Sequence, residues 1–438
     1  MDRTKAKTNN ARFEGAPARP FACPQLWAWL AAGALGSARC HVEGQEALRY
    51  SIASEAAAMS KTLDIESQPY TFKSGDFRAL LSPSLGLQWN DNVYLSKNNA
   101  QDDFILTPLL NIAASYPISQ RNLLQVNIGI GYNEYFNHHE LSRLLLTSGS
   151  QVAFDIYTGD FRINLHDQFS YVQDSALEAA VANTGAYGTF QNTAGVGVTW
   201  DQQDLTVPFG FDHLNNLATS GSFDYTDHST EMVNIRPGLK VHPQLTVGVE
   251  GTVSYTTYDQ RVLNDNTGYT LGVYGDYRPG KYLIIQPRFG YSIYDYRQTS
   301  TTIPAKNQDS WYVDLTLSHQ ATRAITYNLS VGHELRLGIQ SDLVEDWYFR
   351  PNIIWSVIKD VSITTSFFYE NGTETGASLP TSSEGNYNWY GGSLGLGYSP
   401  TRNLNLSLNY RLTFRTSDTS YQEYTQNSVG ILVAYSLQ

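Results

Sequence analysis

Residues 404–415 alternate strictly between apolar and polar side chains. One set of alternate positions carries Leu404, Leu406, Leu408, Tyr410, Leu412 and Phe414, and the other carries Asn405, Ser407, Asn409, Arg411, Thr413 and Arg415. Because successive side chains of a strand point to opposite faces, this segment predicts a strand with one face in an apolar phase and the other in water. The same split recurs in residues 233–241, 325–332 and 347–357.

Composition indicates that this apolar phase is lipid and not a protein interior. Only 16% of the 438 residues are charged, while 13% are aromatic, including 30 Tyr. After residue 40, no apolar run reaches the length of about 20 residues that a transmembrane helix needs. Only helices and closed barrels satisfy every backbone polar group in lipid. The sequence therefore predicts an all-β fold, an antiparallel transmembrane β-barrel of the bacterial outer membrane.

The chain divides into three parts by pattern. Basic residues precede the apolar stretch 26–35, and small residues follow it, so residues 1–38 are expected to be a secretory signal peptide. Residues 39–77 lack strand alternation and are expected to form a periplasmic tail or a short helix. Residues 78–438 are expected to form the outer-membrane β-barrel.

The cysteine positions exclude an internal disulfide, and the net charge limits the classes of partner. Cys23 and Cys40 both lie near the signal segment, so the mature barrel would hold at most one thiol and no internal disulfide. The net charge of −12 excludes a basic nucleic-acid-binding protein. It suits a protein whose partners are outer-membrane lipids.

Turn lengths predict the topology. Short polar turns are expected at residues 117–122, 158–160, 201–204, 241–244, 278–281, 320–324, 359–360 and 399–403. Longer links, such as 174–188, 215–225 and 371–386, lie between them. Outer-membrane barrels place short turns in the periplasm and long loops outside, so the pattern predicts about 18 strands with both termini periplasmic. Sixteen strands would result if the hairpin in residues 144–174 were misassigned.

The last segment resembles the terminal targeting pattern that the barrel-assembly machinery recognises. Ser428, Gly430, Val433 and Tyr435 carry the polar, glycine, hydrophobic and aromatic positions of that pattern. The chain then ends in Ser436-Leu437-Gln438, where many barrels end on an aromatic residue. The resemblance implies that this machinery is a partner.

Several charged, amide and aromatic residues fall on the expected polar faces and are candidates to line the lumen. They are Arg236, Lys240, Tyr274, Asp276, Arg278, Arg288, Tyr312, Asp314, Arg350, Asn405, Asn409, Arg411 and Arg415. Two interpretations stand equally: an electrostatic lining that orders an anionic or hydroxyl-rich solute, or internal charge pairing that keeps the wall rigid. Inward tyrosines, Tyr294 and Tyr348 among them, could stack on sugars or act as neutral filler.

Sites for chemistry are not indicated. His138-His139-Glu140 has metal-ligand residue types, but adjacent side chains do not converge and the sequence places no third ligand. The Gly-x-Ser-x-Gly motif of hydrolases does not occur. We therefore expect no catalytic residue, no metal and no cofactor, and a protein that is not an enzyme.

The segment from Pro83 to Leu95, with Asn90-Asp91-Asn92 before the first outer loop, resembles the opening strand of the beta-barrel porin 2 family. This resemblance implies a single barrel over residues 78–438 and an association with exopolysaccharide secretion. It also implies a periplasmic polysaccharide-export protein as a partner and polysaccharide as the transported solute. The family supplies no catalytic residues.

Three functions follow as competing predictions. The first is an outer-membrane exit channel for exopolysaccharide, whose polar lining makes many weak contacts with a sliding polymer. The second is a diffusion or uptake porin for small sugars or ions, which predicts a long loop folded inward as a constriction. The third is a structural or adhesive surface barrel with a plugged lumen and negligible conductance.

Overall fold

The computed structural model describes residues 69–119, 121–173, 175, 178–301, 303–378, 385–418 and 420–438. The signal peptide expected at 1–38 and most of the tail expected at 39–77 lie outside the described residues. Within the described part of the chain, no helix is long and apolar enough to cross a membrane.

Most of the described chain is in strands. The first ten are β1 (Phe72–Ser74), β2 (Phe77–Asn90), β3 (Asp103–Pro117), β4 (Leu123–Tyr135), β5 (Arg143–Thr158), β6 (Phe161–Val172), β7 (Thr189–Gln202), β8 (Leu205–Ala218), β9 (His228–Ile235) and β10 (Gly238–His242). The others are β11 (Leu245–Tyr258), β12 (Asn266–Gly280), β13 (Leu283–Tyr296), β14 (Gln308–Gln320), β15 (Ile325–Leu337), β16 (Ser341–Ile358), β17 (Val361–Ser378), β18 (Asn386–Tyr398), β19 (Leu404–Ser417) and β20 (Tyr424–Tyr435). Three short 3-10 helices lie in links: η2 (His139–Leu141), η4 (Gly221–Thr226) and η5 (Ser420–Gln422).

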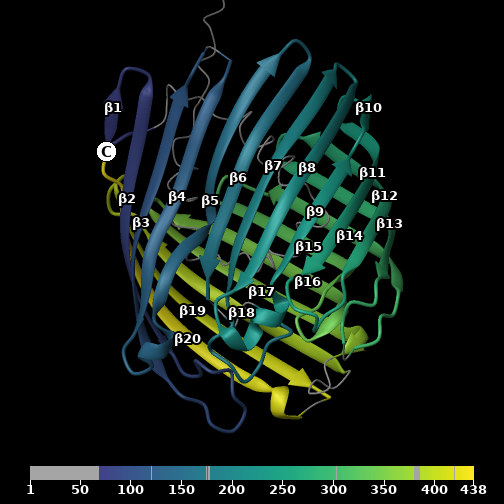
Figure 1. Ribbon diagram of the computed structural model, residues 1–438. Coiled ribbons are helices and arrows are strands. Elements are labelled where there is room, and N and C mark those ends of the chain that lie inside the picture. The colour runs from purple at the N-terminus through teal and green to yellow at the C-terminus, as the bar shows by residue number, and fades with distance from the viewer. Residues whose placement is uncertain are drawn as a thin grey trace, which may run out of the picture.

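The sheet closes on itself. Each strand pairs antiparallel with its chain neighbours, and β2 pairs with β20 from Ser84↔Ala434 to Asn90↔Ser428 (Figure 1). β1 is a short extension that pairs with β2, while β9 and β10 are two halves of one strand. The fold is therefore a closed antiparallel barrel of 18 strands. The hairpin that could have reduced the count is present, because β5 pairs with β6 through Ile156↔Ile163.

A proline explains the interruption between β9 and β10. Both halves pair with β8 on one side and β11 on the other. Pro237 has no backbone N–H to donate to the ladder, so the regular pairing lapses there and resumes at Gly238.

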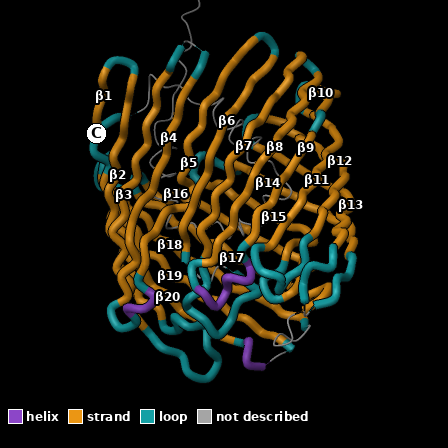
Figure 2. The backbone as a smooth tube through the Cα atoms, viewed as in Figure 1, coloured by secondary structure: helices purple, strands orange, loops and turns teal. Residues whose placement is uncertain are grey.

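The two ends of the barrel differ as expected. All eight predicted short turns join neighbouring strands at one end, which is the upper end in Figure 1. The links at the other end carry the three short helices and gather over the opening (Figure 2). The links expected at 215–225 and 371–386 begin later than predicted, because β8 continues to Ala218 and β17 continues to Ser378. One link at this end is short: β15 joins β16 through the turn 338–340.

The start of the barrel and the last residues of the chain meet at the short-turn end. β1 forms a hairpin with β2 through Phe72↔Ala79, so strand structure starts before the boundary expected at Arg78. Near the C-terminus, Leu437 N donates to Leu81 O at 2.9 Å. Thr71 Oγ1 also donates to the carbonyl of Leu437. These bonds join the start and the end of the barrel at one point on its rim.

The outer surface is apolar in the middle and aromatic at both levels. Leu271 is 71% exposed and Leu394 54% exposed on outward faces. Exposed aromatic side chains near the short-turn end include Tyr116, Phe161, Trp200, Trp355, Tyr398 and Tyr435, and those near the loop end include Phe104, Tyr269, Tyr291, Trp311, Trp347 and Tyr369. A closed barrel with an apolar band between two aromatic girdles is an integral protein of the bacterial outer membrane.

Candidate functional site

The inner wall carries the polar halves of the strands, and its charges are paired. Glu250 on β11 accepts from Arg288 Nη2 on β13 at 2.9 Å and lies 3.3 Å from Arg236 Nε. Tyr312 on β14 donates its hydroxyl to the same carboxylate at 2.6 Å. Two arginines predicted to line the lumen therefore neutralise one buried carboxylate on the wall.

Tyrosines on the inner wall lie across glycines of neighbouring strands. The Tyr312 ring crosses Gly290 and Gly272 to reach its carboxylate, and a Cβ added at Gly272 would lie 2.0 Å from the Tyr312 hydroxyl oxygen. Tyr348 on β16 likewise donates to Asp314 Oδ2 on β14 at 2.6 Å. Since these hydroxyls are bound to carboxylates and both rings are buried, the two tyrosines brace the wall.

Three candidates lie towards the short-turn end of the lumen. Arg278 binds Asp276 through two hydrogen bonds of 2.7 Å, and its side chain is 59% exposed. Lys240 is also exposed. Farther from that end, the Arg236 guanidinium stacks 3.9 Å from the centre of the Tyr274 ring.

The four candidates on β19 divide into two groups. Asn405, Asn409 and Arg411 are partly exposed on the inward face, with Arg411 5.5 Å from the centre of the Phe368 ring. Arg415 is only 2% exposed. Arg411 thus has access to the lumen, whereas Arg415 is covered.

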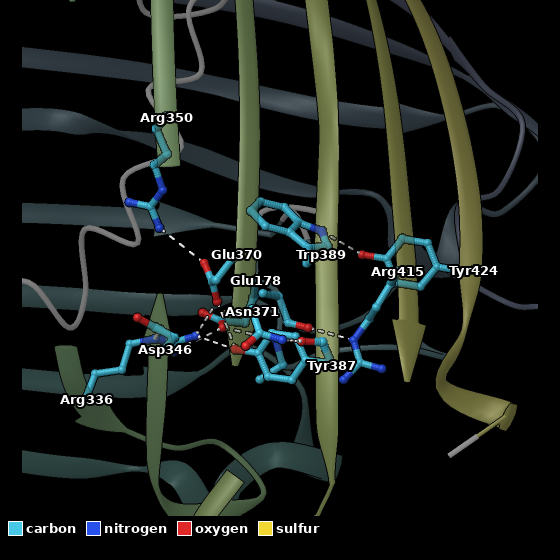
Figure 3. A network of polar contacts seen from close by, with 12 residues as sticks. Glu178, Arg336, Asp346, Arg350, Glu370, Asn371, Tyr387, Trp389, Arg415 and Tyr424 are labelled. Carbon is cyan, nitrogen blue, oxygen red and sulfur yellow. Dashed lines mark hydrogen bonds and ion pairs between the residues drawn. The ribbon is translucent and has the colours of Figure 1, made fainter. Parts of the chain in front are cut away.

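A buried charge cluster occupies the loop end of the wall on β15–β18 (Figure 3). Its centre is Arg336, which donates to Asp346 at 2.6 Å, to Glu370 at 3.0 Å and to the Tyr387 hydroxyl at 3.0 Å. Arg350, another predicted lumen residue, donates to Glu370 at 3.2 Å. We call these five residues the Arg336 cluster.

The link between β6 and β7 reaches this cluster from the other side of the barrel. Glu178 Oε1 lies 3.4 Å from Arg336 Nη1, and Arg415 Nε donates to the carbonyl of Ala179 at 2.7 Å. β6 and β7 belong to the wall nearest the viewer in Figure 1, whereas β15 and β19 belong to the opposite wall. Residues 178–188 of this link, which we call the crossing loop, therefore extend across the lumen.

Apolar packing holds the crossing loop in place. Ala179 is fully buried with Leu95, Val344, Phe368 and Trp389. Ala180 and Val181 pack against Phe223 of η4 and Ile339 of the β15–β16 turn. Asn183 N also donates to Leu95 O at 3.0 Å. Four links from different parts of the chain thus pack together inside the mouth.

Burial changes the pKa of Glu178, the first residue of the crossing loop. Removal from water raises the pKa of the Glu178 carboxyl above its usual range, and the neighbouring Glu370 adds to this. The attraction of Arg336 acts in the opposite direction but does not cancel the effect of burial. Proton binding at Glu178 is therefore favoured when the loop is docked.

The two histidines of the β4–β5 link each contact an acidic side chain and so help to hold this link in place. His138 Nδ1 lies 3.0 Å from Asp103 Oδ2, and His139 Nδ1 lies 3.3 Å from Glu134 Oε1. Each histidine thus has its own acidic partner. Among the described residues, no group of three or more His, Cys, Asp or Glu side chains could hold a metal ion. The expectation that the chain is not an enzyme stays a prediction.

The assembly-signal residues occupy both faces of β20. Val433 and Tyr435 are exposed on the outward face, while Ser428 and Gly430 pair with Arg411 and Asn409 of β19. Their recognition by the assembly machinery stays a prediction.

Sequence reasoning missed Glu178, Arg336, Asp346 and Glu370 as a group. The alternation in β15–β17 does place the last three on polar faces, and that signal was available. Their convergence with a loop residue depends on barrel closure, which brings together positions as far apart as Glu178 and Glu370.

Comparison with known proteins adds only distant structural likeness. No family model matches the chain, and no curated protein matches it. The chain is similar to OccK2 (OpdF) of Pseudomonas aeruginosa, solved with glucuronate, at 11% identity and a TM-score of 0.48, covering 83% of this chain and 99% of that one. A BenF-like porin from Pseudomonas fluorescens gives the same four values. OccAB3 of Acinetobacter baumannii gives 9% identity, a TM-score of 0.47 and coverages of 83% and 99%. Likeness at this level transfers no function.

Proposed function

We propose that this protein is an outer-membrane channel for the diffusion or uptake of small polar solutes such as sugars or ions. An 18-stranded barrel encloses a lumen wide enough for water. The polar inner faces of its strands offer hydrogen-bond partners along the whole path. A membrane-spanning lumen of this kind is suited to passive passage.

The observation that carries the proposal is the crossing loop. Glu178 and Ala179 are bound to Arg336 and Arg415 on the opposite wall. A loop attached at both walls narrows the lumen and limits the size of a solute. A hydrated polymer needs an unobstructed path with weak contacts, so this arrangement favours a small-solute channel over the polysaccharide exit that the sequence predicted first.

Pairing of the wall charges supports the same choice. Arg236, Arg288 and Arg350 each bind a carboxylate of the wall. Paired arginines stiffen a pore of fixed width, and they are less available to guide a long anionic polymer. Among the candidates on β19, Arg411 is the cation with access to the lumen.

Liposome swelling tests the proposal directly. Purified barrels reconstituted into liposomes are exposed to sugars of increasing size, and planar bilayers record ion conductance in parallel. We expect rapid entry of mono- and disaccharides and exclusion of larger oligosaccharides. Free passage of long oligosaccharides would support the polymer exit instead, while negligible conductance and no swelling would support a structural barrel.

A further inference from the structure

A cavity lies at the loop end of the barrel, between the β2–β3 link and the neighbouring ends of β19 and β20. Its volume is about 340 Å³, within the range of about 300 to 1,000 Å³ that small-molecule sites occupy. We call it the rim cavity. Side chains from all three segments line it, among them Ser96, Lys97, Phe414, Thr416, Glu423 and Thr425. Its size suits one small molecule and is too small for a folded partner.

Hydrogen bonds within the chain fix the walls of the rim cavity. Asn92 Nδ2 donates to Ser96 O at 2.8 Å and to Thr425 O at 3.0 Å, and Asn92 Oδ1 accepts from Ser96 N at 2.9 Å. Asn92 is only 1% exposed, so these bonds are shielded from water. They join the β2–β3 link to the start of β20. Because the walls are already ordered, a ligand that binds between them loses little affinity to the ordering of side chains and loops.

The charged groups of the rim cavity form a neutral pair. Lys97 Nζ on the β2–β3 link donates to Glu423 on the β19–β20 link, and their side chains are 40% and 30% exposed. One ammonium and one carboxylate together give no net attraction to an ion of either sign. They still supply strong donors and acceptors, and the hydroxyls of Ser96 and Thr416 can both donate and accept. The cavity therefore suits a neutral ligand with many hydrogen-bonding groups.

An aromatic ring gives the rim cavity an apolar surface. Phe414 on β19 lines the cavity and stacks on Tyr390 of β18, with ring centres 5.3 Å apart and an angle of 24° between the ring planes. This contact fixes the orientation of the Phe414 ring. A sugar ring carries hydroxyl groups and also an apolar face of C–H groups. An aromatic side chain beside paired donors and acceptors matches both of these features.

The rim cavity adjoins the crossing loop. Arg415 lines the cavity, and its Nε donates to the carbonyl of Ala179 in the crossing loop at 2.7 Å. Leu95, the residue before Ser96, accepts at its carbonyl from Asn183 N of the same loop at 3.0 Å. A molecule in the cavity therefore lies beside the constriction of the lumen.

We propose that the rim cavity binds a neutral sugar before the sugar enters the lumen. This inference rests on the proposed channel function, because that function makes the sugar a solute of the barrel. A channel site must bind its solute strongly enough to admit it and weakly enough to release it. Hydrogen bonds from a partly exposed pair and contact with one aromatic ring give binding of this moderate strength.

Titration of the purified, detergent-solubilised barrel with glucose, galactose and maltose tests the proposal, with saturation-transfer NMR as the readout. Phe414→Ala removes the apolar surface, and Thr416→Trp fills the cavity. We expect the affinity for the bound sugar to fall at least fivefold in each variant. Phe367→Ala is the matched control, because Phe367 is an outward aromatic residue that packs against Phe349 of the neighbouring strand. It should bind as the wild type does.

Two results would overturn the proposal: no binding of any of the three sugars to the wild type, or wild-type affinity in both cavity variants. Heat-modifiable migration identifies the variants that are folded. Lipopolysaccharide also carries sugars, so a parallel titration uses its isolated core oligosaccharide. Binding of the core oligosaccharide without binding of a free sugar would overturn the proposal too, since the cavity would then serve the membrane.

The titration needs no transport, so the site and the channel function can fail separately. Sugar binding that depends on Phe414, in a barrel that gives no liposome swelling, would support the site and contradict the channel function alone. Swelling with sugars that none of the proteins binds would contradict the site alone.

Discussion

Glu178 Oε1 and Arg336 Nη1 lie 3.4 Å apart, although the first belongs to the link after β6 and the second to β15 on the opposite wall. Both side chains are almost fully removed from solvent, at 11% and 4% exposure. This contact joins the crossing loop, which narrows the lumen, to the Arg336 cluster on the opposite wall.

Replacing Glu178 with Ala should loosen the crossing loop. A hydrogen bond to a charged group contributes about 1.5 kcal/mol or more, so the ratio of docked to undocked loop should fall roughly tenfold. Single-channel recordings should show more frequent openings to a larger conductance. Glu140→Ala, in the β4–β5 link, is the control and should match the wild type. Identical recordings for all three proteins would mean that the loop does not control the passage.

Acidification should favour the narrowed channel. Because burial raises the pKa of Glu178 in the docked loop, docking takes up a proton, and its stability is greatest at low pH and declines as pH rises through that pKa. Open probability should therefore fall as pH is lowered. In Glu178→Gln the neutral amide stays docked, so the pH response should disappear. If Glu178→Gln kept the pH response of the wild type, a group other than Glu178 would be responsible for that response.

Arg411 and Arg415 should have separable roles. Arg411→Glu changes the charge of a partly exposed lumen residue and should shift the selectivity of the pore towards cations, with unchanged conductance steps. Arg415→Glu removes the bond to the Ala179 carbonyl and should disturb loop docking. Ion selectivity and open-state noise in planar bilayers separate the two effects. An unaltered selectivity in Arg411→Glu would place this residue among the bracing charges.

Gly272→Ala should destabilise the barrel by about 2 kcal/mol, the typical cost of forcing an extra methyl group into a packed site. The new Cβ would lie 2.0 Å from the Tyr312 hydroxyl oxygen and 2.7 Å from the carbonyl oxygen of Phe289. Gly280→Ala is the control, because a Cβ there meets nothing within 4 Å. The urea midpoint of heat-modifiable migration measures the difference. Equal midpoints would show that the tyrosine can move aside without loss.

Surface labelling should report the orientation of the barrel. With Cys40→Ser, a cysteine at Ser222 in η4 should react with an impermeant thiol reagent on intact cells. Cysteines at Gln202 or Arg402, next to short turns, should react only after the outer membrane is opened. The reverse pattern would place the long links in the periplasm.

The sequence by itself determined the barrel, a count of about 18 strands and the faces of the strands with strict alternation; only the pairing of β5 with β6 excluded a count of 16. Alternation is a local property, because neighbouring side chains of a strand point to opposite faces whatever the partner strand is. Residues 404–415 therefore identify a membrane strand without any tertiary information, and the eight short turns separate one strand from the next. Pro237 interrupts a strand whose alternation continues on either side of it.

Only the tertiary structure decided what the inward residues do. Whether Arg288 guides a solute or binds Glu250 depends on a contact between β13 and β11 across an intervening strand, and alternation does not specify such a contact. The docking of Glu178 and Ala179 on the far wall needs the barrel to be closed first. The sequence placed Arg415 correctly on a polar face, but its burial beneath the crossing loop arises from long-range packing, because residues 236 positions apart meet only in the folded chain.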